Sequence, residues 1–253
     1  MALCCLALAA CAPVTYNRYQ PAQTMGEGQF KLAASIDTGC DPMGELWPDV
    51  ANEVGALCTD DPCSGRGVAA AANAPGGNVS FAYGAADIVD VEASLSTALY
   101  ARANAKVQLL RFGGNGALAL SPGGGYLPFA GHGSSDPNLD SIHRDRFSGF
   151  VGTFEAPLTV GWEVAPASIY FGAMSAYTHI QIDYHRIATD YRQNIEHRYD
   201  WILLGPIFGV QFRWKWFIIT PEIVVPFKAV RFRPAYDEST FYISPGLQLG
   251  ARW

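Results

Sequence analysis

The stretch THIQIDYHR holds the side chains whose types and spacing are best suited to chemistry. On a β-strand, His179, Gln181, Asp183 and His185 would share one face, because side chains two residues apart point the same way. A carboxylate beside an imidazole can orient it as a general base, so Asp183 and His185 form the candidate catalytic pair. His179 and His185 could also bind a metal ion. Histidines in such positions are ordinarily polar surface, however, and we expect no metal site and no cofactor.

The spacing of Asp183 and His185 is similar to the Asp-x-His pair of the omptin outer-membrane proteases. That resemblance implies a second pair of acids on another strand to activate water, and nothing in the sequence matches it convincingly. A lipid-A acyl-modifying enzyme is the other enzymatic alternative, using Ser175 and His179 near an outer interface. The remaining histidines are expected on outer loops or strand tops: His132, His143 and His197. We therefore expect a protein that is not an enzyme.

The composition excludes one class of partner and leaves a membrane protein open. The 253 residues carry a formal net charge of -6 with no cluster of Lys or Arg, which argues against nucleic acid. Charged residues make up only 16% and aromatic residues 13%, so the chain can bury a large apolar surface. No run of about 18 apolar residues occurs beyond the N-terminus, which excludes a transmembrane helix but not a membrane barrel.

The N-terminal MALCCLALAACAPV is typical of an export signal rather than of a folded element. Leu8, Ala9, Ala10 and Cys11 resemble a bacterial lipobox, which implies a signal peptide over 1–10 and lipidation at Cys11. The alternative is an ordinary secretory signal that is cleaved nearby. Residues 11–27 are expected to form a periplasmic tether.

Three further cysteines lie in one polar region of the chain: Cys40, Cys58 and Cys63. In an exported protein they are disulfide candidates, and Cys58 and Cys63 or Cys40 with either of them could be bridged. A zinc site would need a fourth ligand that the local sequence does not offer.

Alternation of apolar and polar residues recurs along the chain and predicts β-strands. In the C-terminal TFYISPGLQLGARW every second residue from Phe241 to Trp253 is apolar or small. The same period predicts strands near 217–227, 202–214, 150–162 and 89–99, with weaker ones near 28–37, 78–84, 103–112, 117–127 and 168–182. We expect ten strands, with eight or twelve as alternatives. Prolines within strands are expected at edges or bulges.

The connections between these strands alternate between short and long. Short turns are expected at 84–87, 113–116, 164–167 and 213–216, and long loops at 38–77, 99–103, 128–146, 183–199 and 230–240. Strict alternation is typical of a bacterial outer-membrane barrel, in which short turns face the periplasm and long loops face outward.

Aromatic residues gather at both predicted strand ends, as the interface girdles of a membrane barrel do. Four of the six tryptophans fall at short-turn ends: Trp162, Trp214, Trp216 and Trp253. The opposite ends carry Tyr100, Tyr126, Phe150, Tyr177, Phe227 and Phe241.

Taken with this pattern, the chain resembles small bacterial outer-membrane β-barrel proteins. The terminal LQLGARW is similar to their C-terminal insertion signal, which ends on an aromatic residue. The resemblance implies that Trp253, with Leu247 and Leu249, is recognised by the barrel assembly machinery, and that outer-membrane lipid surrounds the barrel.

The inward strand faces are expected to carry charges of both signs: Lys31, Asp90, Glu92, Lys106, Glu155, Glu163, Glu222, Lys228 and Arg252. Lys106 would lie beside the strand that bears Asp90 and Glu92. These charges could form an ion-pair network that fills the lumen, or line a narrow porin-like pore. The small barrel size favours the first.

The sequence thus predicts an all-β protein, an antiparallel up-and-down transmembrane barrel over residues 28–253. We expect a non-enzymatic surface or envelope protein that acts through its outer loops by binding, adhesion or attachment to an extracellular ligand or envelope partner. The alternatives are a narrow channel, an outer-membrane protease or lipid-modifying enzyme, and, for the fold, a soluble lipocalin-like lipoprotein.

Overall fold

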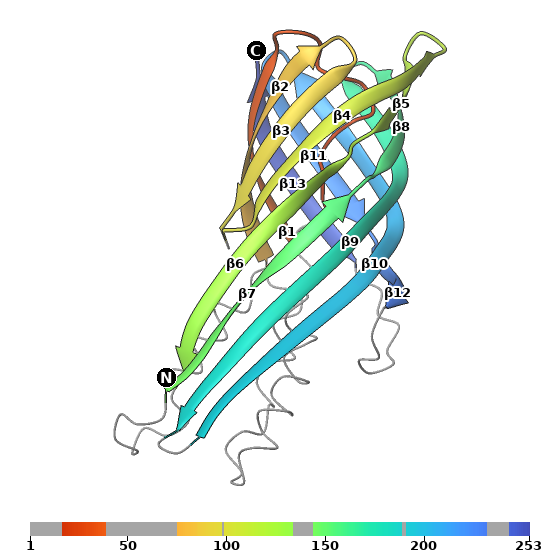
Figure 1. Cartoon of the computed structure of the whole chain (residues 1–253). Helices are drawn as coiled ribbons and strands as arrows, with labels where there is room; N and C mark the ends of the chain where they lie inside the picture. Colours follow the sequence, from red (N-terminus) through yellow and green to blue (C-terminus); the bar gives the residue numbers. More distant parts are fainter. Residues whose placement is uncertain (1–16, 39–74, 98, 134–143, 189–190, 232–242) are drawn as a thin grey trace.

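The computed structural model describes residues 17–38, 75–97, 99–133, 144–188, 191–231 and 243–253 (Figure 1). Within these ranges no helix has the length and hydropathy needed to cross a membrane. The described chain forms thirteen strand segments: β1 Phe30–Thr38, β2 Pro75–Ala86, β3 Val89–Ser96, β4 Ala101–Phe112, β5 Gly116–Leu120, β6 Gly123–Gly133, β7 Arg144–Glu155, β8 Leu158–Val164, β9 Ala167–Ala188, β10 Tyr191–Trp214, β11 Phe217–Val224, β12 Phe227–Arg231 and β13 Ser244–Arg252.

Thirteen segments make ten traverses of the barrel wall, as the alternation predicted. β5 and β6, β7 and β8, and β11 and β12 are each separated by only two residues, at 121–122, 156–157 and 225–226. The second residue of each interruption is a proline, which has no backbone N–H to donate to a neighbouring strand. The partner strand nevertheless continues past each gap: β9 pairs with both β8 and β7, and β10 pairs with both β11 and β12.

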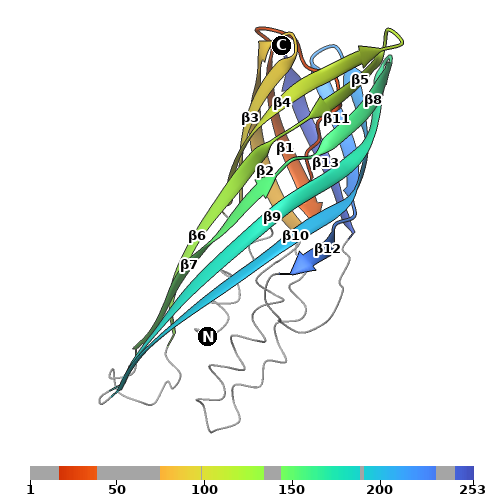
Figure 2. The same ribbon diagram turned by 45° about the vertical axis from the view of Figure 1, so that its right-hand side comes forward.

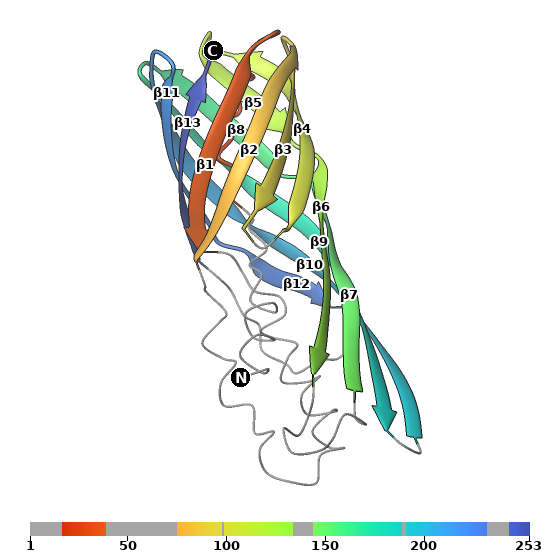
Figure 3. The same ribbon diagram turned by 90° about the vertical axis from the view of Figure 1, so that its left-hand side faces the viewer.

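The sheet closes on itself through antiparallel pairing of the first and last strands (Figure 3). Lys31 lies opposite Arg252, and Asp37 opposite Gly246. The Trp253 N–H donates to the Phe30 carbonyl at 3.1 Å, and the Phe30 N–H donates to the Trp253 carbonyl at 2.9 Å. The chain end therefore forms part of the seam, and the antiparallel barrel predicted from the sequence is confirmed.

Side chains alternate between an apolar exterior and a partly polar interior. On β9 Phe171 is exposed and Tyr170 is fully buried, and on β10 Phe208 is exposed and Gln211 is buried. Exposed large apolar side chains cover most of the wall in this way, from Ile36 on β1 to Leu249 on β13. A soluble lipocalin-like barrel has the reverse arrangement, so this alternative is not supported.

Aromatic side chains ring the end of the short turns, where Trp162, Trp214, Trp216 and Trp253 are all exposed. At the long-loop end Tyr126 and Phe150 form a ring pair at 5.5 Å, with exposed Tyr177 and Phe227 also on the exterior. Tyr100 does not belong to this girdle as predicted. It is buried and donates or accepts a 2.5 Å hydrogen bond with Thr153 inside the barrel.

The strands differ greatly in length at the long-loop end. β6, β7, β9 and β10 continue past all other strands, as Figures 1 and 2 show. β9 has 22 residues and β10 has 24, and they pair without a break from the Tyr191–Ala188 pair to the Phe212–Ala167 pair. The long loop predicted at 183–199 is therefore wrong, because most of these residues belong to a β-hairpin.

We call the projecting part the distal sheet: residues 127–133, 144–151, 180–188 and 191–199. Its base is the row of paired residues Tyr126, Gly152, His179 and Asp200. Pairing of β6 with β4 ends at Tyr126, and pairing of β10 with β12 ends at Trp201. Beyond this row the four strands pair with one another.

Candidate functional site

The barrel interior holds a stretch of the chain's own N-terminal region, which we call the luminal segment, residues 17–25. Asn17, Arg18, Tyr19, Gln20 and Ala22 are all buried. Its end lies at the short turns, where the Thr24 hydroxyl donates to the Asp87 carbonyl at 2.6 Å and the Gln23 amide to the Asn115 carbonyl at 2.9 Å.

The start of the luminal segment lies towards the long-loop end. The Tyr19 hydroxyl contacts Asp37, the second-last residue of β1, and Gly246 near the start of β13 abuts Tyr19 and Asn17. The chain therefore runs down the lumen and then turns at Gly26 and Gly28, whose φ angles of +96° and +78° favour glycine, before entering β1. We expected a tether outside the barrel over 11–27. The described part of that range lies instead mainly within the lumen.

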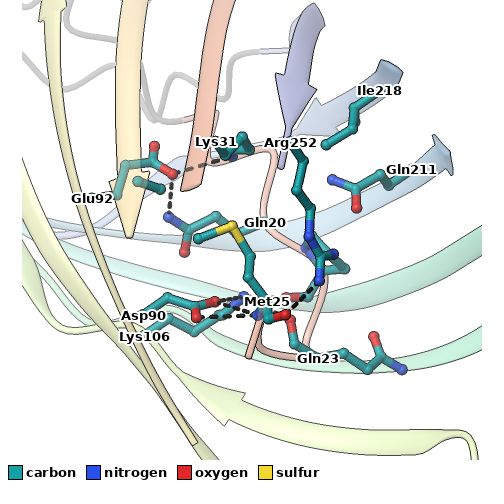
Figure 4. Close-up of a pocket in the computed structure, with 12 residues that line it drawn as sticks. Gln20, Gln23, Met25, Lys31, Asp90, Glu92, Lys106, Gln211, Ile218 and Arg252 are labelled. Atoms are coloured by element: carbon teal, nitrogen blue, oxygen red, sulfur yellow. Dashed lines mark hydrogen bonds and ion pairs between the residues drawn. The ribbon is translucent and has the colours of Figure 1, made fainter. Parts of the chain in front are cut away.

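Near the short turns, the luminal segment is held by paired charges on the wall (Figure 4). Lys106 Nζ lies 2.7 Å from the Asp90 carboxylate across the β3–β4 ladder. The same ammonium donates to the Gln23 carbonyl at 2.7 Å, and Asp90 accepts from the Met25 N–H at 3.1 Å. Buried charges are stabilised only when their hydrogen-bonding capacity is satisfied, and the backbone of the segment supplies this here.

A second pair lies at the barrel seam. Lys31 Nζ is 3.2 Å from Glu92 and donates to Gln248 Oε1 at 3.4 Å. Glu92 also accepts from Gln20 Nε2 of the luminal segment at 2.9 Å. Arg252 donates to Gln29 at 2.6 Å and contacts the Met25 carbonyl. Lys31 of β1 thus links β3 and β13, and the segment binds directly to the network.

Further along the lumen, two wall carboxylates hold the start of the segment. Glu222 accepts from the N–H groups of Arg18 at 2.5 Å and Tyr19 at 2.8 Å, and from the Tyr170 hydroxyl at 2.6 Å. The Arg18 guanidinium forms an ion pair with Glu155, and both side chains are almost fully buried. The Tyr19 hydroxyl donates to the Asp37 carboxylate at 3.3 Å.

The luminal segment leaves little open volume beside it. A cavity of about 30 Å³ lies between the segment and the wall, with Gln20, Met25, Lys106 and Arg252 among its lining residues (Figure 4). A water molecule requires about 10–15 Å³ measured in this way, so the cavity has room for two or three waters. Between the described residues of the luminal segment and the wall, this part of the lumen is therefore filled rather than open.

The other lumen residues predicted from the sequence lie as follows. Glu163 is only half-buried and forms an ion pair with Arg213 at 2.8 Å near the short-turn end. Lys228 lies on β12, and its side chain is outside the described part of the structure. Lys31, Asp90, Glu92, Lys106, Glu155 and Glu222 are buried inside the barrel, and Arg252 is partly buried there.

On the exterior, a polar cluster marks the base of the distal sheet. His179 Nδ1 lies 2.7 Å from Asp200 Oδ1, and the Tyr177 hydroxyl donates to the same oxygen. The His179 ring packs on Phe150 at 5.4 Å. Exterior side chains below this row are mainly apolar, whereas Gln181, Asp183, His185, Glu196 and Arg198 follow above it.

The candidate catalytic residues Asp183 and His185 lie two positions apart on the outward face of β9. Asp183 accepts from the neighbouring Gln181 amide at 3.4 Å, and His185 is exposed on the same outward face. The His–Asp pair that forms on this face is His179 with Asp200. Ser175 donates to the Ala156 carbonyl at 3.0 Å. Among the described residues, no group of three or more His, Cys, Asp or Glu side chains is arranged to hold a metal ion.

Several sequence predictions fall where the structure gives no description. These are the signal peptide over 1–10, Cys11, the disulfide candidates Cys40, Cys58 and Cys63, and His143. His132 and His197 lie on β6 and β10, but their side chains are not described. The exposed side chains of Leu247, Leu249 and Trp253 lie on the exterior near or at the end of β13.

Sequence reasoning missed the luminal segment, although the wall carries a signal for it. A Cβ atom at Gly246 would collide with Tyr19 and Asn17, and one at Gly84 would collide with the Gly26 carbonyl. Ala22 lies in a buried cluster with Ala117 and Ala119. Small residues on inward positions therefore make room for the segment, but they carry this meaning only once the segment's position is known.

Comparisons with known proteins give likeness of fold only. No family model and no curated protein matches the chain. Among solved structures, the attachment invasion locus protein Ail of Yersinia pestis, solved with a heparin analogue, matches at 11% identity and a TM-score of 0.37, over 90% of this chain and 99% of that one. The translocator domain of the autotransporter NalP from Neisseria meningitidis matches at 10% identity and a TM-score of 0.45, over 90% and 88%.

Proposed function

We propose that this chain is a non-enzymatic outer-membrane β-barrel protein that binds a partner outside the cell through its distal sheet. The observation that carries the proposal is the change of exterior character along the β9–β10 hairpin. Phe171, Tyr177 and Phe208 are exposed apolar side chains below the base row. A membrane would cover them, while the polar residues above the row would stand in water.

The distal sheet is long enough to act as a binding surface. Nine residues of β9 lie beyond the base row, which corresponds to about 30 Å at roughly 3.3 Å per residue. Its outward face presents the Asp183 carboxylate and an exposed ion pair in which Arg198 Nε donates to Glu196 at 2.7 Å. Such a rigid polar surface suits adhesion or attachment better than catalysis. Of the outer loops predicted at 38–77, 128–146 and 230–240, the described ends belong instead to β1, β2, β6, β7 and β12. The remaining residues are proposed to add outer loops around the distal sheet.

We also propose how the chain is assembled and modified in the cell. Trp253, with Leu247 and Leu249, would be the signal bound by the barrel assembly machinery, and Cys11 would carry a lipid. The exposed position of the Trp253 ring at the end of β13 supports the first.

A shortened hairpin tests the proposed binding surface. Replacing residues 183–196 by Asn-Gly closes the hairpin just beyond the Ile182–His197 pair, where the two strands are in register. Bacterial cells that display the full chain should attach to surfaces coated with extracellular matrix or to other cells, and the shortened variant should lose this attachment. Heat-modifiable migration on unboiled gels shows whether the barrel remains folded.

A variant that keeps the full length of the hairpin tests whether the partner recognises its charges or its shape. Glu196→Gln with Arg198→Gln removes the exposed ion pair and keeps the hairpin. Reduced attachment of this variant would locate recognition at these charges, and unchanged attachment would assign it to the remainder of the hairpin. Equal attachment by the full chain and the shortened, folded variant would overturn the proposed function.

A further inference from the structure

We infer that the luminal segment is a built-in plug, and that the barrel without it is a cation-preferring pore. This inference is independent of the distal sheet and concerns the opposite part of the molecule. Three observations support it. The wall is shaped to fit the segment, and the segment provides hydrogen-bond and ion-pair partners for the charged side chains of the wall. Without the segment, the lumen would be a polar channel with more acidic than basic side chains.

The first observation is the fit between the wall and the segment. Gly246, Gly84 and Gly161 lie on three different strands, and each faces the chain that descends the lumen or its turn. A Cβ atom at Gly161 would lie 3.4 Å from Ala22 Cβ. Any larger side chain at these positions would occupy space that the N-terminal region now fills.

The second observation is that the contacts involve the backbone of the segment as well as its side chains. Lys106 donates to the carbonyl oxygens of Gln23 and Pro21, at 2.7 and 3.3 Å, and Arg102 donates to the Asn17 carbonyl at 3.2 Å. Glu222 and Asp90 accept backbone N–H groups of the segment. Backbone groups of a chain that traverses a lumen must find partners, and here the charged wall supplies them.

The third observation concerns the charges that would remain on the wall. In the described part of the wall, five acidic side chains are buried: Asp37, Asp90, Glu92, Glu155 and Glu222. Three basic side chains are buried, Lys31, Arg102 and Lys106, and Arg252 is partly buried. Arg18 of the segment supplies a further positive charge through its ion pair with Glu155.

Removing the segment would therefore leave Glu155 without this guanidinium and Glu222 without two N–H donors. Both carboxylates would face water in the vacated space. That space would be about 5 Å wide, the spacing occupied by one extended strand, which admits small cations. Two carboxylates without a basic partner favour cations over anions in a narrow pore.

The position of the segment is tested with an engineered disulfide. Ala22→Cys with Gly161→Cys places the two Cβ atoms about as far apart as a disulfide requires. In a background with the native cysteines replaced by serine, oxidation of membranes should crosslink this pair. The matched control is Ala22→Cys with Trp162→Cys, whose exposed side chain lies on the exterior, and it should stay uncrosslinked. Equal crosslinking of both pairs, or of neither, would overturn the placement.

Planar-bilayer recordings then test the pore. The full chain should be silent, and a variant with residues 17–25 replaced by a Gly/Ser sequence of equal length should show steady unit conductance in potassium chloride. In a salt gradient its reversal potential should shift towards that of potassium, and oxidised Ala22→Cys/Gly161→Cys protein should remain silent. Heat-modifiable migration confirms that each variant is folded. A folded Gly/Ser variant that stays silent, a conducting full chain, or anion preference would each overturn the inference.

Discussion

At the residue scale, buried and exposed ion pairs are expected to contribute very differently. Lys106 and Asp90 are almost fully buried, and both also bind the backbone of the luminal segment. Arg198 and Glu196 form a pair of similar geometry on the outward face of the distal sheet, where both side chains are about half exposed. The two pairs allow the effect of burial to be measured in one molecule.

The substitution Lys106→Met should strongly destabilise the barrel, because it leaves the Asp90 carboxylate buried without its cation. Loss of one partner of a buried pair typically costs about 3–5 kcal/mol, whereas loss of an exposed pair costs at most about 1 kcal/mol. Urea unfolding in lipid vesicles measures the free energy of unfolding of Lys106→Met and of the control Arg198→Met. Similar losses in the two variants would contradict the described lumen.

A second prediction concerns the last residue of the chain. Trp253→Ala should reduce the fraction of protein that assembles in the outer membrane, because it removes the ring that stacks on Phe30 at the seam, with ring centroids 6.5 Å apart. Trp216→Ala is the control, since the Trp216 ring lies exposed on the same rim and pairs with Phe217 instead. The heat-modifiable fraction in isolated membranes is the measurement. An equal decrease in both variants would show that assembly depends on the tryptophans at the short-turn rim in general and not on Trp253 in particular.

At the element scale, the sequence predicted the wall better than the ends of its strands. Alternation continues through Ile180 and Ile182, which are buried, against Gln181 and Asp183, which face outward. We nevertheless predicted a loop from residue 183 onwards. A strand that leaves the membrane retains its period and loses only its apolar exterior face. Under the proposed function, the polar residues above His179 mark the membrane boundary and not the end of the strand.

The distal sheet should depend on its inward face. Ile182→Asn places a polar group at a buried position and should reduce local stability by about 2–4 kcal/mol. Gln181→Asn alters the adjacent outward position and should have little effect. Hydrogen exchange of the β9 amides should accelerate only in Ile182→Asn, while the amides of β1 and β13 keep their protection. Equal exchange in both variants would show that the inward face does not support the sheet.

The luminal segment could not be predicted from its own residues. Asn17, Arg18, Gln20 and Gln23 are polar, lack a two-residue period and precede the first predicted strand, as a solvated tether would. Their partners lie up to 204 residues away, as for Arg18 and Glu222. Six of the predicted inward charges lie buried inside the barrel, but the sequence showed only that they needed partners, and not that the chain itself provides them.

At the scale of the whole molecule, the protein is a cylinder with three zones. An aromatic rim and the short turns lie at one end, and an apolar wall surrounds a polar lumen that holds the luminal segment. The distal sheet projects at the other end (Figure 2). The apolar wall is the feature on which the rest depends. An exterior of this kind is stable only against hydrocarbon, so the distal sheet can be exposed only if lipid covers the wall below it.

The most direct test of this claim compares two positions on the outward face of β10. Arg198 and Phe208 are both about half exposed in the bare protein, and they lie above and below the base row. Each is replaced by cysteine in a background without native cysteines, and intact cells are treated with a membrane-impermeant maleimide. Arg198→Cys should be labelled, and Phe208→Cys should be labelled only after denaturation. Equal labelling of the two positions on intact cells would contradict the claim that lipid covers the wall below the base row. Labelling of Phe208→Cys alone would show that lipid covers Arg198 instead.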